Sequence, residues 1–255
     1  MPAHRREWIA SRLMADGSIT VQEVEAEFGV SPMTARRDLG ILEREGRAHR
    51  THGGAVAPTL ARHEDSFAAR LEQASGAKLR LAGAASLFVD DGEAVFVDSS
   101  TTAYMAVREL LTAGRRMTVL TNSLPVMDLV AQSDVGNVDL IGLAGTLRKA
   151  TRSLVGPLTV DAIERHFADK LLFSVNGLAP GGVLTDPDSL EAEVKRAMVG
   201  QAREAILLVD GSKFGRAGLS AITDVKRVAA VLVAGASAEQ LLPLAQTGVR
   251  MEEVR

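Results

Sequence analysis

The start of the chain alternates helical and turn signals. Apolar residues recur at helical spacing over residues 5–15, and the Asp-Gly pair at 16–17 then breaks the pattern, which predicts a first short helix. A second helix is expected over residues 21–28, because Thr20 and Glu23 form a capping-box pattern directly ahead of an apolar stripe.

A third helix follows a Gly-Val turn at 29–30. Ser31 is a good N-cap, and Pro32 fits the first helical position, where its missing N–H costs nothing. Gly46 suits the position after the helix end. On a helical wheel one side is apolar and the other small or basic: Ala35, Leu39 and Leu42 against Met33, Arg37, Gly40 and Arg44, with Arg36 on the flank.

Residues 47–56 contain two short extended pieces around Gly53-Gly54, which predicts a β-hairpin. Three helices followed by a basic hairpin are typical of a winged helix-turn-helix, so we assign residues 1–57 to a DNA-binding domain. Residues 58–75 carry no strong strand pattern and are interpreted as a linker with some helical character.

From residue 76 to residue 255 short apolar runs alternate with helical stretches. The expected strands are 94–98, 117–121, 138–142, 171–175, 206–210 and 228–233. The expected helices lie near 78–88, 102–113, 124–133, 158–168, 189–203 and 237–246. Continuous apolar strands separated by helices predict an α/β domain with a mainly parallel sheet that is covered on both faces.

Composition narrows the class of protein. With 46% hydrophobic and 24% charged residues among 255, the chain resembles an ordinary globular protein, and no apolar run is long enough to span a bilayer. The absence of cysteine fits a reducing compartment, so we expect a cytoplasmic protein without membrane association. No cofactor is expected. His49 and His52 are three residues apart but lack further ligands, so we expect no metal site.

The net charge of −3 gives no support for a strongly basic nucleic-acid binder. Residues 1–57 carry eight Arg against eight Asp plus Glu, yet five of these arginines lie between 36 and 50. A local basic surface therefore remains possible, although an adjacent Arg pair is often only a solvated helix face. The candidate DNA-binding residues are Ser31, Met33, Thr34, Arg36, Arg37, Arg44, Arg50 and His52.

Polar residues follow several of the expected strands. They lie at 98–102, 121–123 and 142–146, and at 210–213, which ends in Lys213. In open α/β sheets ligands bind beyond the carboxyl ends of the strands, where hydroxyls, helix N-termini and a lysine suit a phosphate or a polyol. Each element alone is also explained as an N-cap, a turn or a solvated lysine.

Several motifs resemble the DeoR family of bacterial sugar-catabolism regulators. They are Val-Ser-Pro-Met-Thr-Ala-Arg-Arg-Asp-Leu at 30–39, Leu-Glu-Arg-Glu-Gly at 42–46 and Arg-Thr-His-Gly-Gly-Ala at 50–55. The resemblance covers nearly the whole chain. Ala35 departs mildly from the family, which commonly has a β-branched residue there.

The second domain resembles the sensor domain of that family, whose fold is similar to ribose-5-phosphate isomerase. The resemblance implies a phosphorylated sugar effector, and it points to binding roles for Asp98, Thr101, Thr102, Asn122, Lys195 and Lys213. The candidate effector-binding residues are Asp98, Ser99, Ser100, Thr101, Thr102, Asn122, Lys195 and Lys213. Leu143-Ala144 interrupts what is often a Gly-Gly pair, and Gly211 stands where the family often has Ser.

These features predict an effector-controlled regulator rather than an enzyme. The resemblance implies a repressor that binds double-stranded operator DNA and is released by a phosphorylated sugar, as a homo-oligomer, either dimer or tetramer. One alternative is an active sugar-phosphate isomerase or hydrolase fused to a DNA-binding head, with Asp98, Glu191 or Glu193 as acid or base beside Lys195 and Lys213. Another is a partner-binding module without a small ligand.

Overall fold

A computed structural model of the chain describes residues 2–16, 18–45, 47–50, 53–56, 66–134 and 136–254. The chain divides into two compact units, residues 1–64 and 65–255, which are considered separately.

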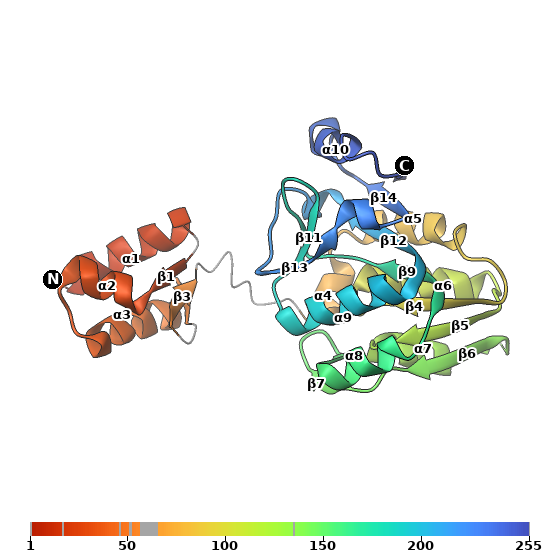
Figure 1. Cartoon of the computed structure of the whole chain (residues 1–255), viewed down its shortest axis with the longest axis horizontal. Helices are drawn as coiled ribbons and strands as arrows, with labels where there is room; N and C mark the ends of the chain where they lie inside the picture. Colours follow the sequence, from red (N-terminus) through yellow and green to blue (C-terminus); the bar gives the residue numbers. More distant parts are fainter. Residues whose placement is uncertain are drawn as a thin grey trace. The chain divides into compact units, whose positions relative to one another are not determined.

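The first unit has the helical order that the sequence predicts (Figure 1). Its elements are α1 (Pro2–Asp16), β1 (Ser18–Thr20), α2 (Val21–Phe28), α3 (Pro32–Arg44), β2 (His49–Arg50) and β3 (Gly54–Val56). Thr20 and Glu23 form the expected capping box of α2. Gly29 ends that helix at φ +61°, a left-handed conformation that glycine adopts without strain. Gly46 lies outside the described residues.

The core of the first unit joins one face of each helix to the hairpin. Ala35, Leu39 and Leu42 of α3 are buried against Ile9 and Leu13 of α1. Within the described residues, β1 adds to the expected hairpin to give the antiparallel order β1-β3-β2. The helix-turn-helix and its hairpin are therefore present as predicted, and β1 is an addition.

The second unit is built on a parallel sheet whose seven strands, in the described part of the chain, run in the order β15-β14-β12-β9-β4-β5-β6. The strands are β4 (Glu93–Val97), β5 (Met117–Thr121), β6 (Val138–Gly142), β9 (Ala168–Phe173), β12 (Ala202–Asp210), β14 (Ala230–Ala234) and β15 (Met251–Val254). The six expected strands are all found, and β15 was missed.

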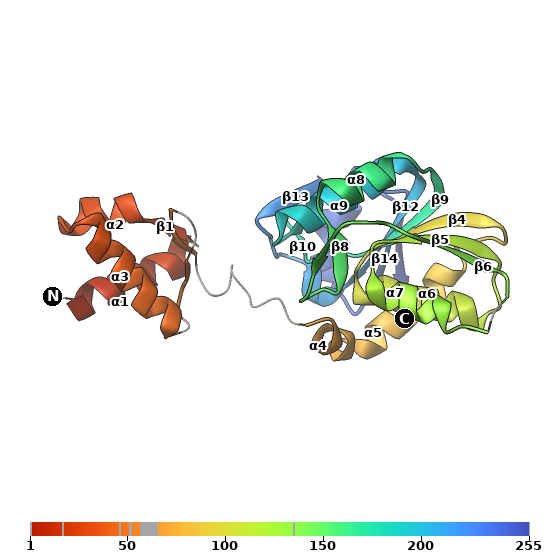
Figure 2. The ribbon, with the colours of Figure 1, turned by 90° about the horizontal axis from the view of Figure 1, so that it is seen from below.

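Helices cover both faces of this sheet. Figure 2 shows α5, α6 and α7 on one face and α8 and α9 on the other. The helices are α4 (Phe67–Glu72), α5 (Ser75–Ser86), α6 (Thr101–Thr112), α7 (Leu124–Ala131), α8 (Pro157–Glu164), α9 (Ser189–Gln201) and α10 (Ala238–Ala245). Successive residues of the central strand enter opposite cores, since Phe96 packs with the α8–α9 side and Val95 and Val97 with the α5–α6 side.

Smaller elements lie beside the sheet. β7 (Thr146–Arg148) and β8 (Ser153–Val155) form an antiparallel pair, and β10 (Gly177–Leu178), β11 (Val183–Asp186) and β13 (Ser220–Asp224) form a second antiparallel sheet. The short 3-10 helix η1 (Gly211–Lys213) follows β12.

Part of the expected linker is packed onto the second unit. Phe67 of α4 is buried, stacks edge to face on Tyr104 at 5.5 Å between ring centroids, and donates its backbone N–H to Ala150 O. Residues 66–75 therefore belong to the second unit because α4 has an apolar contact there. No helix in the described residues combines the length and apolarity that a membrane crossing requires.

Candidate functional site

The start of α3 is ordered by two hydroxyl side chains. Ser31 Oγ accepts a hydrogen bond from Thr34 N at 3.3 Å and lies 3.0 Å from Thr34 Oγ1. Both residues were candidates for DNA contact; the Ser31 hydroxyl caps the helix, and the Thr34 hydroxyl is hydrogen-bonded to it. Their first role is to orient the N-terminus of α3, where free N–H groups and the helix dipole favour phosphate.

The outer face of α3 is open. Met33 is 74% exposed, and Arg36 and Arg37 are exposed and form no hydrogen bond or ion pair with another described residue. Arg44 is exposed as well, but its Nε donates to Gly40 O at 3.3 Å within the helix. The wheel analysis therefore placed these side chains correctly, and Arg36 and Arg37 have guanidinium groups available for DNA.

A buried carboxylate holds α3 against α1, a feature that the sequence analysis missed. Asp38 is 3% exposed, and its carboxylate contacts Arg5 Nε at 2.5 Å and Arg6 Nη1 at 3.6 Å. Arg47, one of the five clustered arginines, pairs with Glu7 at 2.9 Å. The basic surface of the first unit is thus smaller than the arginine count indicated.

The wing carries the remaining DNA-contact candidates. Arg50 lies in β2, which pairs with β3. Its side chain, and the whole of His52, lie outside the described residues.

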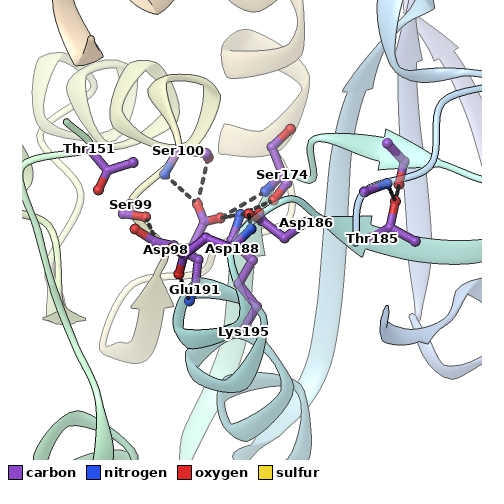
Figure 3. A network of polar contacts seen from close by, with 12 residues as sticks. Asp98, Ser99, Ser100, Thr151, Ser174, Thr185, Asp186, Asp188, Glu191 and Lys195 are labelled. Atoms are coloured by element: carbon purple, nitrogen blue, oxygen red, sulfur yellow. Dashed lines mark hydrogen bonds and ion pairs between the residues drawn. The ribbon is translucent and has the colours of Figure 1, made fainter. Parts of the chain in front are cut away.

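In the second unit, polar side chains meet at the end of β4. From β4 the chain continues to β5 and β6 on one side of the sheet and then to β9 and the later strands on the other side. β4 pairs with β5 on one side and β9 on the other, and a ligand site is expected at such a switch point. Asp98 follows β4 and is fully buried (Figure 3). Its Oδ1 accepts from Ser100 N at 3.0 Å and Ser100 Oγ at 2.5 Å, and its Oδ2 accepts from Ser174 N at 3.2 Å.

Lys195 of α9 joins this network. Its Nζ lies 3.2 Å from both Asp98 Oδ2 and Asp186 Oδ2 and donates to Ser174 O at 2.8 Å. Burial alone would lower the pKa of Lys195, but Asp186, Asp98 and Glu191 together raise it above the ordinary value. The lysine is therefore charged at neutral pH, and the described residues supply three partners for its ammonium.

Glu191 adds a third buried carboxylate (Figure 3). Its Oε2 accepts from Ser99 Oγ at 2.9 Å, its Oε1 accepts from Ser153 Oγ at 2.5 Å, and Arg148 Nη1 lies 3.9 Å away. Burial raises the pKa of Asp186; Lys195 opposes that shift and Glu191 adds to it. We name Asp98, Asp186, Glu191 and Lys195 the acidic network.

The other sequence candidates lie around this network. Ser100 caps α6 by accepting from Ala103 N at 3.1 Å, and Thr101 and Thr102 are buried in its first turn. Asn122 is buried, and its Nδ2 donates to Leu154 O at 2.9 Å while its Oδ1 has no hydrogen-bond partner in the described part of the chain. The predicted residues of the β4 and β5 ends and of α9 are thus brought to one edge of the sheet.

A second cluster is cationic, and the sequence analysis found only Lys213 of it. Arg70 of α4 has buried Nε and Nη2 atoms with no hydrogen-bond partner among the described residues. Lys78 of α5 donates to the Arg70 carbonyl and to Gln73 O, the latter at 2.6 Å. Lys213 is half-buried, and no hydrogen bond or ion pair joins its ammonium to another described residue. We name these three residues the cationic cluster.

The charges of this cluster act on one another. Burial, together with the charges of Lys213 and Arg70, lowers the pKa of Lys78 to about 8, against a smaller opposing effect of Asp210. Burial also lowers the pKa of Lys213, and Lys195 and Arg70 contribute to the shift. Three cations beside a single carboxylate that acts on both lysines, Asp210, favour binding of an anion.

η1 places Lys213 in this cluster. Asp210 caps η1 by accepting from Ser212 N at 2.8 Å. A Cβ at Gly211 would collide with the carbonyl oxygen of Gly235, so a side chain is excluded there. The departure from the family's usual Ser is therefore a packing requirement.

Comparison with known protein families covers both units. Residues 5–60 match the model of the DeoR-like helix-turn-helix domain, and residues 73–234 match the model of the DeoR C-terminal sensor domain.

Named relatives align over most of the chain. A putative aga operon transcriptional repressor of Escherichia coli O157:H7 is 31% identical over 98% of this chain and 93% of its own length. The L-fucose operon activator of Escherichia coli K12 is 28% identical over 91% of this chain and 95% of its own length. A solved ribose 5-phosphate isomerase A from Methanocaldococcus jannaschii matches with a TM-score of 0.40 and 18% identity, covering 55% of this chain and 54% of that one. The structural match is too distant to bear on chemistry.

Proposed function

This chain belongs to the DeoR family of DNA-binding transcriptional regulators, and we propose that it is a repressor of a sugar-catabolism operon whose affinity for operator DNA falls when a phosphorylated sugar binds the second unit. Relatives named as an aga operon transcriptional repressor and as a lactose phosphotransferase system repressor support repression, although two relatives are named L-fucose operon activators.

The exposed face of α3 supports the DNA half of the proposal. Arg36 and Arg37 are exposed and have no hydrogen-bond or ion-pair partner among the described residues, and the opposite side of their helix is buried in the core. A guanidinium group donates two hydrogen bonds to the O6 and N7 atoms of guanine in the major groove, or pairs with phosphate. Because operators with two half-sites require two reading heads, we propose a homo-oligomer, with a dimer as the minimum.

The ligand half rests on Arg70, whose buried Nε and Nη2 atoms have no hydrogen-bond partner among the described residues. Buried polar atoms in folded proteins are nearly always hydrogen-bonded, and an unpaired buried cation is costly. The charge of Arg70 lowers the pKa of both Lys78 and Lys213. The region therefore holds three cations, and Asp210 is the carboxylate that acts on both lysines. A phosphate group supplies the missing acceptors and the missing negative charge.

The acidic network supports recognition of sugar hydroxyls beside that phosphate. The buried hydroxyl groups beside it can donate and accept hydrogen bonds with a polyol, and the Asn122 Oδ1 atom, which has no partner in the described part of the chain, can accept one. One ligand with a phosphate at one end and hydroxyl groups at the other matches both clusters. We therefore propose a sugar phosphate rather than a free sugar or inorganic phosphate.

The same network argues against catalysis. A general base needs a carboxylate oxygen free to take a substrate proton, yet both oxygens of Asp98 and both of Glu191 already accept hydrogen bonds from this chain. Lys195 is equally engaged. We propose that the second unit binds its ligand without turnover, and that neither cofactor nor metal takes part.

A thermal-shift screen of the full chain tests the proposal. Each phosphorylated sugar is paired with the same sugar without phosphate, so that the cationic cluster and the acidic network are probed separately. A ligand at 100 times its Kd stabilises by about 2.7 kcal/mol, which is roughly 5–11 °C for a unit of this size. Stabilisation by a phosphorylated member alone supports the proposal, and turnover of that ligand, followed by NMR, would establish the isomerase alternative instead.

A further inference from the structure

Met33 is a large apolar side chain left in water on the outer face of α3. It is 74% exposed, whereas the apolar residues Ala35, Leu39 and Leu42 of the same helix are at most 1% exposed. It has no place in the core of the first unit. Single exposed apolar side chains are common on protein surfaces, and Leu87, Phe167 and Leu219 are more exposed still, so the place of Met33 on α3 decides what it can contact.

Its position is that of a base-reading residue. Met33 is the second residue of α3, and the N-terminal residues of a recognition helix approach the base edges. It precedes Arg37 by one helical turn, so the two side chains share a face and lie about 5–6 Å apart at their Cβ atoms. The face therefore presents an apolar group beside a guanidinium.

Base chemistry restricts what an apolar side chain can recognise. The major groove offers hydrogen-bond donors and acceptors on every base pair, but its apolar feature is the C5-methyl group of thymine. A thioether side chain makes no useful hydrogen bond with the polar base edges.

We propose that Met33 specifies a thymine in the operator by packing against its C5-methyl group. This inference rests on the proposed DNA-binding function and adds a specificity to it. Because adjacent base pairs are 3.4 Å apart along a strand, the thymine lies within about two base pairs of the base contacted by Arg37.

The test begins with selection of duplexes from a random-sequence pool by the full wild-type chain. Each thymine of the selected site is then replaced by deoxyuridine, which removes the methyl group and keeps every hydrogen-bonding group. Affinities are measured by fluorescence anisotropy at one salt concentration for the wild type, Met33→Ala and Met33→Leu.

The wild type is expected to lose about fourfold in affinity at one thymine of each half-site, the equivalent of one buried methyl group. Met33→Ala should bind the thymine and deoxyuridine duplexes equally, within twofold, while Met33→Leu keeps the difference. Because Met33 is exposed, the variants should retain the wild-type melting temperature, which is measured alongside.

Three results overturn the inference. The first is a selected site without thymine, or one whose deoxyuridine variants bind the wild type unchanged. The second is a methyl effect that survives in Met33→Ala, which assigns the methyl contact to another residue. The third is selection of no sequence at all, which refutes the proposed DNA-reading function itself and is thereby distinguished from the other two.

Discussion

Replacing Arg70 by methionine should raise the stability of the ligand-free protein and remove its response to the effector. The substitution keeps a long flexible stem and deletes a guanidinium whose Nε and Nη2 atoms are buried without hydrogen-bond partners in the described residues. A structural arginine would behave in the opposite way, because its removal destabilises the fold. The sign of the stability change therefore separates a binding role from a structural one.

The magnitudes follow from the contacts. An unsatisfied buried polar group costs about 1–3 kcal/mol, and more when it is charged. Its removal should raise the melting temperature by roughly 2–4 °C for each kcal/mol regained. Loss of one charge-assisted contact to a phosphate should weaken effector binding by about 1.5–3 kcal/mol, or roughly ten- to hundredfold.

Differential scanning calorimetry gives the first quantity and isothermal titration of the effector gives the second. Arg108→Met is the matched control, because Arg108 is an exposed arginine on α6 of the same unit. That control should leave both quantities unchanged. A lower melting temperature for Arg70→Met together with unchanged effector affinity would refute the anion-binding role of Arg70.

Three further outcomes are expected. Arg37→Ala should weaken specific operator binding by about 1–3 kcal/mol in fluorescence anisotropy, and unchanged affinity of the folded variant would remove Arg37 from the groove. Arg50→Ala should weaken binding to all sequences alike and lower the salt slope by about one unit, whereas a changed base preference would assign base reading to the wing. Because the pKa of Lys78 is lowered to about 8 in the folded protein, titration calorimetry should show the effector affinity falling as the pH rises through 8. In the unfolded chain Lys78 stays charged up to its ordinary pKa of 10.5. The free energy of unfolding should therefore rise between these two pKa values, because the unfolded chain binds more protons there. A flat affinity profile from pH 7 to 9 would exclude Lys78 from the phosphate site.

The elements of the first unit were predictable because their signals are local. The capping box at Thr20 and Glu23 and the N-cap at Ser31 are formed by residues three positions apart. The wheel of α3 separated buried from exposed residues, since helix geometry alone fixes which side chains share a face. The Asp38 contacts with Arg5 and Arg6 were not predictable, because they join positions more than thirty residues apart.

Most strands of the sheet were predictable because they are largely buried on both faces, and the edge strand β6 was predictable because its sequence is mainly apolar. β15 escaped notice because Met251–Val254 carries two glutamates and lies at the edge of the sheet. The sheet of β10, β11 and β13 depends on pairings between distant segments, such as Asp186 with Ser220. No local sequence pattern predicts such pairings.

Part of the candidate site could be predicted from the sequence. Asp98 and its hydroxyl neighbours stood out as a polar run after an apolar strand. Arg70 and Lys78 did not stand out, because they lie in the sequence before the first strand of the sheet. Their burial results from the packing of α4 and α5 within the second unit. The residues that we propose bind a phosphate are therefore brought together by tertiary contacts that the sequence does not reveal. The end of the first domain at residue 57 remains a prediction.

Titration of a phosphorylated sugar against preformed complexes of the full chain with selected operator DNA tests the central claim most directly. The sugar phosphate that stabilises the wild type should dissociate its complex, and Lys213→Ala should bind the operator with wild-type affinity yet remain on DNA at that concentration, because coupling between the two sites is reciprocal. Dissociation of the Lys213→Ala complex at the wild-type concentration, or wild-type complexes that stay intact under saturating effector, would contradict the account.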